Sequence, residues 1–138
     1  MTVRRAHFLG DRRGNAAVEF ALTLPILAFL IFGTVNLCMV VYAMVDLQST
    51  VEQSARYAST YTSAHSAADP GSTAVTTYAT SRYYGPNVGA TYTYSSTDHC
   101  ATYNGSNVGH RVTASGAYKV NFGLGAMTVP LSATACFA

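Results

Sequence analysis

An uncharged run of 26 residues, from Phe20 to Val45, restricts this chain more than any other feature of its sequence. As an α-helix the run would be about 39 Å long, which exceeds the ~30 Å hydrocarbon core of a bilayer. A secretory signal peptide has an apolar region of only about 7–15 residues and ends at a small-residue cleavage site, which the sequence after Val45 lacks. A core helix of a soluble domain is the alternative, but a chain of 138 residues has little other mass to surround it. The run is therefore predicted to stay in the protein as a membrane helix.

The charges that flank the run predict its orientation. Four of the 8 Lys and Arg residues precede residue 14, whereas the other flank opens with Asp46 and Glu52. The positive-inside rule then leaves residues 1–14 in the cytoplasm and exports the chain after Asp46. Because so much of the positive charge lies in this short segment, the exported part has no basic face of the kind that binds nucleic acid.

The junction before the run places an acid where an unpaired charge is costly. A basic stretch ends in Gly14, four residues follow, and Glu19 then stands beside Phe20. An isolated carboxylate in a lipid-facing helix costs about 2.5–3.5 kcal/mol at the bilayer centre and less near the interface, so it needs a partner. The positions four residues away are Asn15 and Thr23. The partner would come from another element, another subunit or a newly made terminal amine; otherwise Glu19 only marks the aqueous boundary of an ordinary single-pass helix.

The same junction carries a family resemblance. Small residues lead into Val18-Glu19-Phe20-Ala21-Leu22, and Pro25 and an aliphatic run follow. With Arg12-Arg13-Gly14 before it, this order resembles a type IV prepilin cleavage site. More narrowly, residues 13–58 are similar to the TadE-like family, small pilin-like proteins of tight-adherence (Tad) pilus systems. A weaker likeness covers residues 126–135, which are similar to the terminal strand of that family.

The resemblance implies how the junction is used. A prepilin peptidase would cut after Gly14, and Asn15 would become the new N-terminus. The Glu19 carboxylate, with Phe20 beside it, would neutralise the terminal ammonium of a neighbouring subunit as the helices pack. The expected partners are the peptidase, other pilin subunits, the pilus assembly platform and inner-membrane lipid. The expected location is the inner membrane before assembly and the pilus or cell surface afterwards.

The apolar run and the chain beyond it predict an α+β fold, with a long N-terminal helix and a small antiparallel-sheet head. Pro25 cannot donate to the carbonyl of Ala21, so a bend is expected there. Leu47, Val51 and two alanines repeat at helical spacing and extend the helix to about Thr62. This Ala-rich face is expected to pack against either a sheet or a partner helix.

The order of segments in the head follows from turn residues and period-two patterns. A second short helix is expected over residues 73–84, strands over 91–95, 111–118 and 128–137, and turns or a bulge at 104–105 and 115–116. The predicted organisation is a leader over 1–14, a transmembrane and assembly helix over 15–45, a helix continuation over 46–62 and a head over 63–138.

Two pairs of residues in the head invite specific predictions. A Cys100–Cys136 disulfide in the oxidising exported compartment would close a loop of 36 residues (136 − 100), worth about 3–4 kcal/mol. Two independent buried thiols are the alternative. Tyr92 and Tyr94 share one face of a strand, and they form either core or a contact surface. Burial of both against the helix would end the contact-surface hypothesis.

No feature of the sequence indicates catalysis. The four His residues lack metal-ligand spacing, and neither a phosphate-binding loop nor a hydrolase motif is present. We expect no enzymatic activity, no metal and no cofactor. The predicted role is a minor pilin or assembly component of a Tad pilus. The alternatives are an uncleaved single-pass periplasmic binding module and a major, filament-forming pilin.

Overall fold

The computed structural model describes residues 13–65, 69–96, 101–103, 106–121 and 125–137. By its internal contacts the chain divides into two compact units, Met1–Val35 and Asn36–Ala138.

One long helix, α1 (Arg13–Ala64), supplies the secondary structure of the described residues of the first unit and the first element of the second. The predicted helix to about Thr62 is therefore confirmed. No Gly or Pro occurs between Thr34 and Ala64, and the helix continues through Pro25. Apolar helices tolerate an interior proline better than polar ones, because neighbouring groups can satisfy the freed carbonyl.

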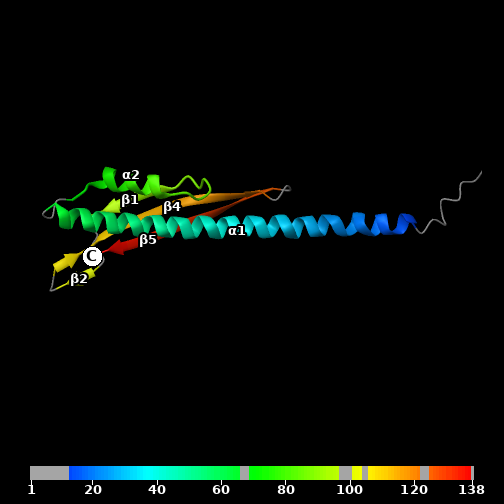
Figure 1. Cartoon of the computed structure of the whole chain (residues 1–138), viewed down its shortest axis with the longest axis horizontal. Coiled ribbons are helices and arrows are strands. Elements are labelled where there is room, and N and C mark those ends of the chain that lie inside the picture. Colours follow the sequence, from blue (N-terminus) through cyan, green and yellow to red (C-terminus); the bar gives the residue numbers. More distant parts are fainter. Residues whose placement is uncertain (1–12, 66–68, 97–100, 104–105, 122–124, 138) are drawn as a thin grey trace, which may run out of the picture. The chain divides into compact units, whose positions relative to one another are not determined.

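The second unit adds a short helix and an antiparallel sheet, so the predicted α+β fold is confirmed (Figure 1). Helix α2 (Ser72–Arg82) precedes a sheet with the strand order β1-β4-β5. A separate hairpin pairs two three-residue strands. The bounds of the strands are β1 Thr91–Ser95, β2 Ala101–Tyr103, β3 Ser106–Val108, β4 His110–Asn121 and β5 Ala126–Phe137. All three predicted strands are present, and β4 and β5 are longer than predicted.

The core of the second unit lies between the sheet and the outer part of α1. The α1 face that carries Leu47 and Val51 is fully buried, as are the alanines at positions 43, 55 and 58. It belongs to one cluster with Val112 of β4, Leu131 of β5 and Val75 of α2. Burying a side chain such as Leu47 contributes about 1.5–3 kcal/mol. Of the two packing partners considered for this face, the structure selects the sheet of the same chain.

The prediction of a turn or bulge at residues 115–116 is wrong. Ser115 and Gly116 lie inside β4, where Gly116 pairs with Leu131 in an uninterrupted register. The glycine is needed for a different reason: a Cβ at this position would lie 2.9 Å from the carbonyl oxygen of Val88. The amide of Ala117 donates to that same oxygen over 2.8 Å. Gly116 thus lets the segment before β1 approach the face of β4. The other predicted turn, at residues 104–105, lies outside the described residues.

Candidate assembly segment and head site

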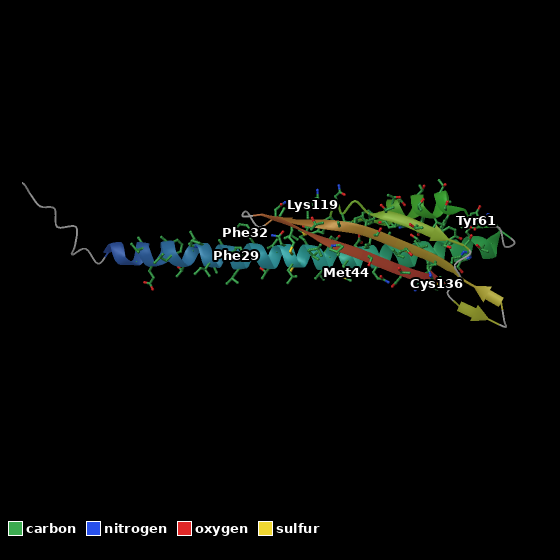
Figure 2. All side chains as sticks on the ribbon, turned by 180° about the vertical axis from the view of Figure 1, so that it is seen from behind. Phe29, Phe32, Met44, Tyr61, Lys119 and Cys136 are labelled. Atoms are coloured by element: carbon green, nitrogen blue, oxygen red, sulfur yellow. The ribbon has the colours of Figure 1, made fainter. Side chains whose placement is uncertain are left out.

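The helical segment of the first unit presents apolar side chains in every direction. Each large hydrophobic residue from Val18 to Val35 is between 46% and 70% exposed. Figure 2 shows such side chains, among them the labelled Phe29 and Phe32. The helix is long and apolar enough to cross a membrane, and its most apolar window is not buried at all within the chain. Exposed apolar surface of this extent is characteristic of contact with lipid or with other apolar helices.

The hydroxyl groups of this segment are satisfied within the helix itself. The Thr23 hydroxyl lies 3.1 Å from the carbonyl oxygen of Glu19 and 3.2 Å from that of Phe20. The Thr34 hydroxyl donates to the carbonyl oxygen of Ile31 over 2.8 Å. Threonines bonded back to their own helix can enter an apolar environment without an unsatisfied donor.

The charge of Glu19, by contrast, is not neutralised by a basic side chain in this part of the helix. It is exposed on the first turns of α1, and residues 14–55 contain neither Lys nor Arg. The hydroxyl of Thr23, four residues on, is already committed to main-chain carbonyl oxygens. Gly14 and Asn15 lie at the start of α1, and Phe20 is exposed beside Glu19. The arrangement leaves a carboxylate at the edge of an apolar surface, open to a cation from outside the helix.

The head contains a hydrogen-bonded network that the sequence did not indicate. The Tyr94 hydroxyl donates to Asp69 over 2.9 Å and lies 2.7 Å from Nδ1 of His110, whose Nε2 lies 3.2 Å from the Thr62 hydroxyl. Thr62 in turn donates to the carbonyl oxygen of Ala58. The network thus joins the His110 ring through the Tyr94 hydroxyl to the Asp69 carboxylate.

The electrostatics of the network favour the charged carboxylate. Burial alone would raise the pKa of Asp69, but hydrogen bonds from the Gly71 amide, Ser96 and Tyr94, together with the charge of His110, lower it below the ordinary value of 3.8. Burial and the bond to Asp69 raise the pKa of Tyr94. The Asp69 side chain also closes the turn that it forms with Pro70 and Gly71, by accepting from the Gly71 amide over 3.0 Å.

Tyr92 and Tyr94 belong to the core and its margin. Tyr94 is 9% exposed and lies in the central cluster, and Tyr92 is half-buried against that cluster. The Tyr92 hydroxyl is buried without a hydrogen-bond partner among the described residues. Burial, with Tyr83 and Asp46 nearby, raises the pKa of Tyr92 to about 12. The face of β1 that they share is turned towards the core, which favours a core role for Tyr94, whereas the contact-surface hypothesis for the half-buried Tyr92 stays a prediction.

Asp46 has a structural role beyond bounding the apolar run. Its Oδ2 accepts from the amides of Tyr84 and Gly85, over 2.8 and 2.7 Å. These bonds tie α1 to the segment that follows α2. The signal available in the sequence was a lone acid directly after 26 uncharged residues, but the partner amides are 38 and 39 residues away.

The cysteines divide into one free thiol and one predicted pair. Cys38 is free and exposed on α1. Cys136 lies near the end of β5, opposite Arg111 of β4. Cys100 lies outside the described residues, so the Cys100–Cys136 disulfide stays a prediction. Within the part of the chain that the structure describes, no group of three or more His, Cys, Asp or Glu residues could hold a metal ion.

A single long apolar N-terminal helix, together with a small antiparallel sheet, is consistent with the pilin-like class of α+β proteins. Residues 14–56 match the model of a family described as TadE-like protein, which confirms the resemblance over those residues. The matched segment contains the Gly14 junction, the apolar run and the part of α1 that packs on the sheet. No curated protein and no solved structure matches the chain.

Proposed function

We propose that this chain is a membrane-anchored, non-enzymatic subunit of a Tad pilus, acting as a minor pilin or assembly component. The observation that carries the proposal is Glu19. It is an exposed carboxylate at the start of an apolar helix, and residues 14–55 supply no base to neutralise it. The match to the TadE-like family over the same residues supports a role in pilus assembly.

Cleavage after Gly14 would create the missing cation. Gly14 lies in the first turn of α1, where the backbone has the fewest helical hydrogen bonds. A glycine there extends easily into a peptidase active site because it has no side chain to restrict the backbone. Removal of residues 1–14 would leave the α-amino group of Asn15 as a terminal ammonium, with a prepilin peptidase as the processing enzyme.

Pairing between subunits follows from helical geometry. Asn15 and Glu19 are four residues apart, which is about 6 Å along a helix axis. A neighbouring helix displaced by that distance would bring its Asn15 ammonium level with Glu19. An opposite pair at an apolar contact costs less than a lone buried carboxylate, and the exposed apolar faces around Phe20 would close over it. Other pilin subunits and the assembly platform are the proposed partners.

The proposed topology places residues 1–14 in the cytoplasm and the head outside the inner membrane before assembly. After assembly the head would lie on the pilus or cell surface. The positive flank at the N-terminal side of the run and Asp46 at the other side support this orientation.

The variant Glu19→Ala tests the pairing directly. It should insert into the membrane like the unaltered chain but reduce pilus number and co-purification of other pilin subunits by at least tenfold. Glu52→Ala is the matched control, since Glu52 is an exposed acid on the same helix beyond the apolar run. Normal piliation with Glu19→Ala would contradict the proposal. Loss of membrane insertion in that variant would show that Glu19 acts in anchoring instead.

A further inference from the structure

The β4–β5 hairpin begins beside the outer end of α1. His110 at the beginning of β4 contacts Thr62 near the outer end of the helix, 3.2 Å away. Figure 2 shows both strands running along α1, with Cys136 on the side of Tyr61 and Lys119 farther along the strands, away from Tyr61. The ten residues from His110 to Val120 span about 34 Å of strand, which corresponds to about 23 residues of helix. Val120 is therefore level with about residue 39 of α1.

Burial agrees with this placement. Val120 is only 3% exposed, and Val40 packs against the head core. Ala43 is completely buried. The hairpin thus covers one side of α1 from about residue 40 outward, which includes the last six residues of the apolar run.

The part of the apolar run that the head does not cover matches the thickness of a bilayer. The full run from Phe20 to Val45 is about 39 Å long and exceeds a ~30 Å hydrocarbon core by about 9 Å, or six residues of helix. Those six residues correspond to the part of the run, 40–45, against which the head packs. The remaining 20 residues, 20–39, are about 30 Å long and fit the hydrocarbon core without excess.

The far end of the hairpin carries side chains suited to a membrane interface. Met127 pairs with Val120 in the ladder and shares its core-side face, yet it is 55% exposed because the core ends there. Lys119 is exposed on the opposite face of the same strand end. A flexible apolar side chain and a long cationic one at the same end of the hairpin suit the boundary between acyl chains and phosphates.

We propose that the Lys119–Asn121 and Ala126–Met127 end of the hairpin rests on the outer surface of the membrane that holds α1. Met127 enters the interface, and the Lys119 ammonium lies among lipid phosphates. This inference rests on the membrane anchoring in the proposed function. It keeps this end of the hairpin at the outer surface of the membrane, so a subunit that leaves the membrane must break this contact.

The experiment uses the full chain in nanodiscs of phosphatidylethanolamine and phosphatidylglycerol, in a Cys38→Ser background. An environment-sensitive fluorophore is attached at Met127→Cys or, as the control, at Ser132→Cys. Ser132 is also exposed on β5 but lies five residues, about 17 Å, farther from the hairpin end. The Met127 probe should be quenched at least threefold more by lipids spin-labelled near the headgroup than the Ser132 probe. It should be correspondingly protected from aqueous iodide.

Equal lipid quenching at the two positions, with full access of iodide to both, would overturn the proposal. A third probe at Phe29→Cys, inside the apolar run, separates this failure from failure of the anchor. Quenching at Phe29 by acyl-chain spin labels without quenching at Met127 would reject the hairpin contact alone. Absence of quenching at Phe29 would reject the membrane anchor and the hairpin contact together.

Discussion

The hydroxyl of Tyr94 donates to the carboxylate of Asp69 over 2.9 Å and so joins an outer strand of the sheet to the turn before α2. The same hydroxyl lies 2.7 Å from Nδ1 of His110, and Nε2 of His110 lies 3.2 Å from the hydroxyl of Thr62 on α1. Strands β1 and β4, helix α1 and the turn before α2 are thus linked through Tyr94 and His110.

Removal of the Tyr94 hydroxyl should destabilise the head. Tyr94→Phe removes one hydrogen bond from Asp69, which is exposed to solvent, and one from the partly buried His110, and should lower the free energy of unfolding by about 0.5–1.5 kcal/mol. Tyr92→Phe is the matched control on the same strand, because its buried hydroxyl has no partner among the described residues. The control should be neutral or stabilising by up to about 1 kcal/mol. Urea unfolding of the full chain in detergent micelles measures both, and equal losses would contradict the network.

The lowered pKa of Asp69 predicts a loss of stability in acid. The unfolded chain binds this proton near pH 3.8, and the folded head binds it only at lower pH. The contribution of Asp69 is therefore complete above the unfolded value and disappears as the pH falls through the folded one. Unfolding measured between pH 2 and 6 should show this decline below about pH 4, and Asp69→Asn should flatten it. If the free energy of unfolding of the variant falls below pH 4 as steeply as that of the unaltered chain, the decline comes from other groups.

The close approach at Gly116 predicts a steric penalty. Gly116→Ala would place a Cβ 2.9 Å from the Val88 oxygen and 3.0 Å from its Cγ2, and should cost about 1–3 kcal/mol of stability. Gly125→Ala is the control, since a Cβ there meets no atom within 4 Å. Thermal unfolding of the two variants should separate them by several degrees. Equal melting temperatures would show that the segment around Val88 moves away freely.

The elements of this fold were predictable because they depend on local patterns. The apolar run and the spacing of Leu47 and Val51 predicted α1 to within two residues of its end. The alternating residues of the head predicted β1, β4 and β5. Local pattern could not tell which face of β1 is buried, so the environment of Tyr92 and Tyr94 stayed open.

The details of the site were less predictable because they join residues far apart in the sequence. Gly116 is required by Val88, and Asp46 is paired with amides 38 and 39 residues away. Neither relationship has a signature in either segment alone. The role of Glu19 depends on a group outside its own helix, so its sequence position indicates the need for a partner without identifying it.

A Cys100–Cys136 disulfide predicts a specific chemical result. Intact mass under non-reducing conditions should be about 2 Da below that of the reduced chain, with one thiol, Cys38, available for alkylation. Cys136→Ser should lower the free energy of unfolding by about 3–4 kcal/mol, whereas Cys38→Ser should not change it. Three alkylated thiols in the unreduced exported protein would show that the pair is not formed.

The N-terminal residue of the native protein, extracted from membranes of cells that build pili, is the most direct measurement of the proposed function. Sequencing from the N-terminus, together with intact mass, should identify Asn15 as the first residue, with residues 1–14 absent. Retention of Met1 or Thr2 in normally piliated cells would contradict processing after Gly14. It would leave Glu19 without the terminal ammonium that the assembly proposal requires.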